Sequence, residues 1–109
     1  MQDKDRQIVL AFKKQLSDAV ANHVKKLIVF GSRATEQAAE ESDLDLIVLV
    51  DEKTPDIEQA LEDVAYDVMW QLDFKPIISL KVFAESRFQG GVDKGYSFYK
   101  NVEKEGVAV

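Results

Sequence analysis

The spacing of apolar residues along the chain predicts two long helices. From about residue 5 to residue 22, apolar side chains recur at steps of three and four, which is typical of an amphipathic helix. A second pattern of this kind begins after Thr54 and Pro55, where a threonine cap and a proline in the first turn favour a helix start. The apolar stripe of this second helix consists of Ile57, Leu61, Val64, Val68 and Leu72.

Three short apolar segments predict strands, at residues 27–30, 43–50 and 74–83. The middle segment starts as an alternation of acids and leucines and ends as a continuous apolar run, which indicates burial on both faces of a sheet. Pro76 indicates that the third segment is an edge strand or begins irregularly.

Shorter helices are expected between and after these strands. We expect them at residues 32–39, capped by Ser32, at residues 85–88, and at residues 96–104. Gly90 and Gly91 are expected to form a flexible connection between the last two. Helices that alternate with short strands predict one layered domain of the α/β (α+β) class over residues 1–109.

Composition narrows the class of protein. The chain has 109 residues, 46% of them apolar and 31% charged, with a net charge of −6 and no cysteine. These values are typical of a globular domain without disulfides or thiolate metal sites, and the acidic balance disfavours general nucleic-acid binding. The longest apolar run is too short to span a membrane and the polar N-terminus is no signal peptide, so we expect a cytoplasmic protein with no membrane partner.

The first candidate for chemistry is the turn at Gly31 and Ser32, between a predicted strand and a predicted helix. Glycine lets a ligand approach the main chain, and the N–H groups at a helix start attract an anion such as phosphate. The Ser32 hydroxyl adds a further donor. Taken alone, turns of this kind are mostly structural.

The second candidate is the pair Asp43 and Asp45, which head the next strand ten residues after Ser32. Residues two apart on a strand share a face and lie about 6.6 Å apart, so both carboxylates can converge on one cation. Mg²⁺ favours carboxylate oxygens together with substrate phosphates. A pair of acids at a strand end is by itself usually solvated, but the ordered combination with the glycine turn predicts a site for a nucleoside triphosphate and Mg²⁺.

The segment Phe30-Gly31-Ser32, ten residues, Asp43-Leu44-Asp45-Leu46 resembles the signature of minimal, antitoxin-type nucleotidyltransferases in the DNA polymerase beta superfamily. The resemblance implies a nucleotidyltransferase fold, with a small mixed sheet of three to four strands flanked by helices. It implies that Gly31, Ser32 and Arg33 bind the nucleotide, for example ATP, and that Asp43 and Asp45 are the catalytic residues and hold Mg²⁺. The implied reaction transfers a nucleoside monophosphate to a hydroxyl acceptor and releases pyrophosphate. Small members often pair with a HEPN-domain protein as a toxin–antitoxin system.

Two positions depart from the family pattern. Thr35-Glu36 replaces an Arg-Gly pair, which removes one cation near the phosphates. Ser79 stands where active members carry a third carboxylate, Lys81 shares its face, and Asp73 and Glu85 at the strand ends are poor substitutes. Three hypotheses stay open: a transferase, a catalytically degraded antitoxin-like binding module, and an acidic regulatory domain with a chance motif.

Tyr66 and Trp70 lie on the second long helix, opposite its apolar stripe, at about 180° and 220° from Ile57 on the helical wheel. Because they are four residues apart, they lie next to each other on one face. Two interpretations are open: the pair packs under the C-terminal helix, or it is a surface for a partner. The partner would be a HEPN-type protein or a second copy of this chain.

Overall fold

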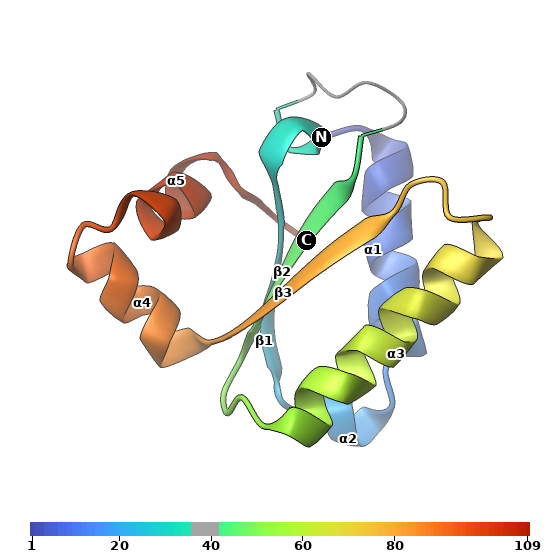
Figure 1. Ribbon diagram of the computed structural model, residues 1–109, viewed down its shortest axis with the longest axis horizontal. Coiled ribbons are helices and arrows are strands. Elements are labelled where there is room, and N and C mark those ends of the chain that lie inside the picture. Colours follow the sequence, from blue (N-terminus) through green and yellow to red (C-terminus); the bar gives the residue numbers. More distant parts are fainter. Residues whose placement is uncertain (36–41) are drawn as a thin grey trace.

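A four-stranded sheet with helices on both faces forms the domain (Figure 1). The computed structural model describes residues 1–35 and 42–109. Its helices are α1 (Asp3–Gln15), α2 (Asp18–Ala21), α3 (Pro55–Gln71), α4 (Glu85–Asp93) and α5 (Ser97–Glu105), with a short 3-10 turn η1 (Gly31–Arg33). Its strands are β1 (Val24–Phe30), β2 (Leu44–Val50), β3 (Ile78–Ala84) and β4 (Val107–Ala108). No helix in these two ranges is both long enough and apolar enough to cross a membrane.

The sheet has the order β3-β2-β1-β4 and is mixed, because β2 and β3 are parallel whereas the other pairs are antiparallel. Successive residues of β2 point to opposite faces. Leu44 and Leu46 lie in the larger core, which also includes buried residues of α1 and α3. Ile47 and Leu49 lie in the smaller core, under α4 and α5. The mixed α/β fold with a strand buried on both faces confirms the prediction from the sequence.

The first helix is shorter than the sequence predicts. A single helix was expected as far as residue 22, but α1 ends at Gln15 and α2 begins at Asp18. Leu16 adopts an extended backbone and is buried, and the Ser17 hydroxyl accepts a hydrogen bond from the Val20 N–H at 3.3 Å. Ser17 therefore caps a new helix in the middle of an uninterrupted apolar pattern.

The third strand begins later than expected, at Ile78 instead of residue 74. Asp73 and Phe74 have positive φ angles of 55° and 57°, so the chain turns sharply before the strand starts. The Phe74 N–H donates to the Met69 carbonyl at 2.8 Å, which folds this turn back onto the end of α3. Pro76 lies in this irregular segment before the strand, which agrees with the prediction of an irregular start.

The C-terminal segment differs from its prediction in two ways. Gly90 and Gly91 do not break the helix but lie inside α4, and a Cβ on Gly91 would overlap the ring of Tyr99 in α5. Glycine is therefore what lets α4 and α5 pack closely. The chain then ends in β4, an unexpected two-residue strand that pairs with Ile28 and Val29 of β1.

Candidate active site

The end of β1 and the start of β2 bring Gly31 and Asp45 together. Phe30, the last residue of β1, is the register partner of Asp45 in the antiparallel ladder. Gly31 follows with a φ of +79°, and a Cβ at this position would lie 2.6 Å from Oδ2 of Asp45. The missing side chain thus leaves room for the carboxylate while permitting a left-handed backbone. The glycine turn and the acids, which the sequence presents as separate features, meet at one place.

Asp43 and Asp45 flank Leu44, which is fully buried in the larger core. The alternation of an extended chain therefore turns both carboxylates toward the opposite side of the sheet. Asp43 is exposed and Asp45 is half-buried. Over residues 1–35 and 42–109, no group of three or more histidine, cysteine, aspartate or glutamate side chains is arranged to hold a metal. Two carboxylates that share a face nevertheless fit the way Mg²⁺ is commonly bound, with substrate phosphates completing the ligands.

Ser79 lies directly beside Asp45 on the neighbouring parallel strand, as the predicted register requires. Lys81 is the partner of Ile47, two positions further along. Leu80, between them, packs against the larger core, so Ser79 and Lys81 share the face of Asp45. The position beside Asp45 on β3 is therefore occupied by a hydroxyl, with an exposed ammonium group next to it on the strand.

The two acids considered as substitutes for a third carboxylate lie elsewhere. Asp73 is exposed in the turn that follows α3. Glu85 follows Ala84, which pairs with Val50 at the opposite end of β2 from Asp45. Neither carboxylate belongs to the group around Gly31 and Asp45.

Arg33, expected from the resemblance to bind nucleotide, is 4% exposed. Its Nη1 lies 2.7 Å from Oδ1 of the buried Asp5 in α1. Its Nε and Nη2 both donate to the Ser42 carbonyl, at 3.0 and 2.7 Å. Because Ser42 directly precedes Asp43, this guanidinium ties α1 and the η1 turn to the start of the acidic strand. Asp5 was not identified from the sequence; its position three residues before Ile8, in line with the apolar stripe, is a signal for a buried acid but does not identify Arg33 as its partner.

The backbone at Ser32 forms a shorter and tighter turn than the predicted helix start. Residues 31–33 form a single 3-10 turn instead of the start of a helix, and residues 36–39 of the expected helix lie outside the described residues, as does Glu36. A short turn carries little of the dipole that a long helix would supply. Ser32 itself is exposed, and its carbonyl accepts a hydrogen bond from the Thr35 hydroxyl at 3.1 Å.

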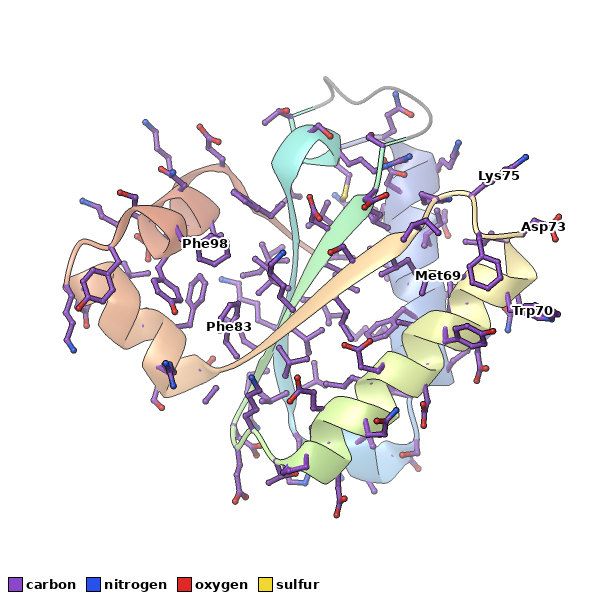
Figure 2. All side chains as sticks on the ribbon, in the orientation of Figure 1. Met69, Trp70, Asp73, Lys75, Phe83 and Phe98 are labelled. Carbon is purple, nitrogen blue, oxygen red and sulfur yellow. The ribbon has the colours of Figure 1, made fainter. Side chains whose placement is uncertain are left out.

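Aromatic rings lie on the face of the sheet that carries Asp45, Ser79 and Lys81. The rings of Phe30 and Phe98 meet edge to face with centroids 5.9 Å apart, and Phe83 lies 6.0 Å from Phe98. Figure 2 shows Phe83 and Phe98 where the α4–α5 layer meets the sheet. Phe98 is 36% exposed, so the group around Asp45 has an apolar boundary on the side of α5.

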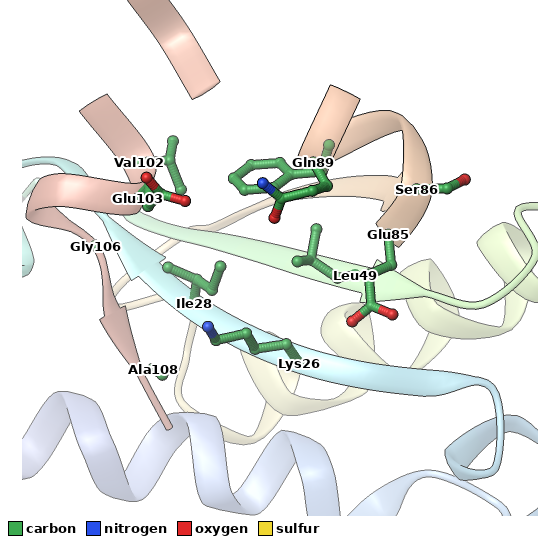
Figure 3. A pocket seen from close by; sticks show the side chains of 11 residues that line it. Lys26, Ile28, Leu49, Glu85, Ser86, Gln89, Val102, Glu103, Gly106 and Ala108 are labelled. Carbon is green, nitrogen blue, oxygen red and sulfur yellow. The ribbon is translucent and has the colours of Figure 1, made fainter. Parts of the chain in front are cut away.

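A separate cavity of about 480 Å³ lies at the other end of this face, between the sheet, α4 and the end of α5 (Figure 3). Its charged lining consists of Lys26, Glu85 and Glu103, over a floor that includes Ile28 and Leu49. Two carboxylates against one ammonium group make it unsuited to a triphosphate. None of the residues predicted to bind nucleotide or metal lines it.

The comparisons with known proteins identify a family for the chain. A family model described as a nucleotidyltransferase domain matches residues 7–109. The matched range includes Gly31, Ser32, Asp43 and Asp45. No curated protein matches the chain.

Proposed function

Because the chain belongs to the nucleotidyltransferase domain family, we propose that it binds a nucleoside triphosphate with Mg²⁺ at Gly31 and the two aspartates and transfers the nucleoside monophosphate to a hydroxyl acceptor. Nucleotidyl transfer is the general activity of this family, whose members generally use divalent metals. The observation that supports the finer proposal is the close approach of Gly31 to the Asp45 carboxylate. A glycine backbone and a carboxylate that is able to hold Mg²⁺ lie there side by side.

In this proposal each residue has a separate task. The backbone at Gly31 and the exposed Ser32 hydroxyl face the phosphates, and Asp43 and Asp45 hold Mg²⁺. When bound, Mg²⁺ neutralises charge on the phosphates and on the departing pyrophosphate. Arg33 acts at a distance, because its hydrogen bonds to the Ser42 carbonyl fix the backbone just before Asp43. In the reaction, the acceptor hydroxyl loses its proton to solvent, its oxygen bonds to the α-phosphorus, and the bond to pyrophosphate breaks.

Proton removal from the acceptor hydroxyl is the step that this site supports least. Ser79, beside Asp45, is no general base at neutral pH. This observation favours a second candidate function, in which the chain binds nucleotide without transferring it and acts on a partner protein as an antitoxin-like module. The two candidates share the binding site and differ only in the chemical step.

Thermal unfolding with and without Mg²⁺ and ATP tests the shared binding site. We expect the ligands together to stabilise the protein, by about 2.7 kcal/mol at a hundredfold excess over Kd. Asp43→Asn with Asp45→Asn should abolish this stabilisation, while the free variant melts at the same temperature or higher because like charges no longer repel each other. Asp63→Asn with Asp67→Asn on α3 is the matched control for charge. If the Asp43/Asp45 variant keeps the full ligand-induced shift, the metal site is not there.

Incubation with labelled nucleoside triphosphates, Mg²⁺ and the product of the adjacent gene separates the two candidates. Label that becomes covalently attached to the added protein indicates a transferase. Ligand-induced stabilisation without any attached label indicates the binding module. The Asp43/Asp45 variant serves as the background for both measurements.

A further inference from the structure

Three aromatic rings, two of them exposed and that of Phe74 half-buried, form a cluster on the outer side of α3. The ring centroid of Phe74 lies 5.6 Å from that of Tyr66 and 5.8 Å from that of Trp70, both edge to face. Tyr66 is 55% exposed and Trp70 67%. Figure 2 shows Trp70 and Asp73 at the outer end of α3, away from the sheet. We call Tyr66, Trp70 and Phe74 the α3 aromatic cluster.

The turn after α3 completes this cluster. Phe74 has a φ of +57°, a left-handed conformation that is unfavourable for a bulky residue. In that conformation its ring reaches back to Tyr66 and Trp70. Backbone in such sparsely populated conformations persists only where the surrounding structure holds it in place.

No part of the described chain covers the cluster from outside. The sequence left open that Tyr66 and Trp70 pack under the C-terminal helix, but α5 lies on the opposite face of the sheet (Figure 1). The rings of α5 contact one another and the rings of Phe83 and Phe88 instead. The interpretation in which α5 buries Tyr66 and Trp70 is therefore wrong.

Most charges around the cluster are negative, and Lys75, next to Phe74, is the exposed cation beside it. Helix α3 contains five acidic residues and no lysine or arginine. On the helical wheel Glu62 lies to one side of Tyr66, and Asp63 and Asp67 lie beyond Trp70 on the other. Within residues 1–35 and 42–109, none of these three carboxylates takes part in an ion pair. Glu62, Asp63 and Asp67 thus form an acidic rim along two sides of an apolar centre.

We propose that the α3 aromatic cluster and its acidic rim are a docking surface for a basic amphipathic helix of a partner protein. Aromatic residues supply the buried centre of such interfaces, and complementary charge at the rim orients the partner. A helix with leucine-like residues on one side and lysine or arginine on the other fits both features. The proposal goes beyond nucleotide chemistry and does not depend on it.

The acidic rim of the α3 aromatic cluster disfavours other binding partners at this surface. In a symmetric dimer each cluster would face its own copy, which would bring two acidic rims together. Nucleic acids and anionic lipid surfaces carry phosphate charges that the rim would repel.

Trp70 is the only tryptophan in the chain, so its fluorescence reports directly on this surface. The test titrates the full chain, without nucleotide, with a synthetic amphipathic helical peptide of leucine and lysine. We expect saturable binding with a blue shift of the Trp70 emission, weakened by salt because charge contributes. A peptide of the same composition in scrambled order should bind more weakly. Equal binding of both peptides would overturn the proposal of an amphipathic helix.

Two double variants that change the net charge equally show where on the protein the peptide binds. Asp63→Lys with Asp67→Lys should weaken peptide binding by about tenfold or more. Glu103→Lys with Glu105→Lys, on exposed positions of α5, should have a much smaller effect. Thermal melts confirm that each variant is folded. Equal weakening by the two pairs would mean general attraction to an acidic protein and would refute the surface.

A second pair of variants tests the aromatic centre. Tyr66→Ser should weaken binding, whereas Tyr96→Ser, which removes a ring of 56% exposure from the other helical layer, should not. Light scattering after size exclusion completes the test. If the free chain is a dimer that Tyr66→Ser converts to monomer, the occupant is a second copy and the proposal is wrong.

Discussion

At the scale of single residues, Gly31 explains how a backbone turn and a carboxylate share one site. We expect Gly31→Ala to abolish the stabilisation by Mg²⁺ and ATP, because the new Cβ displaces Asp45. The variant should also lose about 1–2 kcal/mol of folding stability through its positive φ. Gly95→Ala is the matched control, since Gly95 has the same φ of +79° but a Cβ added there would meet no neighbouring atom within 4 Å. Melts of both variants, with and without ligands, provide the measurement.

The expected outcome is that both alanine variants are destabilised through their positive φ, Gly31→Ala at least as much as Gly95→Ala because its Cβ also displaces Asp45, and that only Gly31→Ala loses the response to ligands. A normal ligand-induced shift in Gly31→Ala would show that displacement of Asp45 does not matter for binding. A lost response in Gly95→Ala would show that backbone strain alone impairs the site.

Ser79 is the second residue on which the function depends. We expect Ser79→Asp to accelerate transfer of labelled nucleotide, toward the factor of about 10²–10⁴ that a positioned general base contributes. The metal-free variant should melt at a lower temperature, because a third carboxylate beside Asp45 adds like-charge repulsion. Ser86→Asp, at an exposed position of α4, controls for the added charge. Unchanged transfer in Ser79→Asp would mean that the missing acid does not limit the reaction.

The residues of the site could be predicted where their signal is local. Asp43 and Asp45 were predicted as a pair from strand alternation. The resemblance drew attention to Ser79, and the structure places Ser79 beside Asp45 as the predicted register requires. The bond between Arg33 and Asp5 could not be predicted in this way, because 28 positions separate the two residues and only the packing of α1 against the turn brings them together.

At the scale of whole elements, a helix start was predicted correctly where the sequence contains a clear N-cap residue. The Thr54 hydroxyl accepts a hydrogen bond from the Ile57 N–H at 3.2 Å, and α3 begins at Pro55 as expected. Prediction failed where tertiary packing decides. The helix break at Ser17 lies within an uninterrupted apolar pattern, and β4 exists only because β1 offers a free edge to two residues.

The turn between α3 and β3 permits a prediction at this scale. Asp73 has a φ of +55°, and we expect Asp73→Gly to raise the free energy of unfolding by up to about 1 kcal/mol by removing left-handed strain. Gln71→Gly, two residues earlier and still inside α3, should instead lower it by about 0.5–1 kcal/mol. Urea denaturation measures both values. Destabilisation in Asp73→Gly equal to that in Gln71→Gly would show that the turn stores no strain.

At the scale of the whole molecule, the two faces of the sheet are unequal. The larger core joins α1 and α3 to the sheet, whereas α4 and α5 cover the other face with a smaller set of buried side chains. The candidate active site lies on that thinner side. The sequence predicted the alternating elements and the single layered domain, but periodicity does not specify which face each helix covers. That is why the position of α5 relative to Tyr66 and Trp70 stayed open until the structure was known.

This asymmetry predicts that the α4–α5 layer opens before the rest of the domain unfolds. Native-state hydrogen exchange should show lower opening free energies for amides in α4 and α5 than for those in α3 and β2, because fewer buried apolar side chains hold that layer. Val102→Ala, which removes two methyl groups from the smaller core, should lower protection in α4 and α5 by about 2 kcal/mol while α3 changes less. Phe12→Ala in the larger core should lower protection everywhere by about 3–5 kcal/mol. If Val102→Ala instead lowers protection equally in all helices, the domain opens as one cooperative unit and the face of the sheet that carries Asp45 has no separately mobile cover.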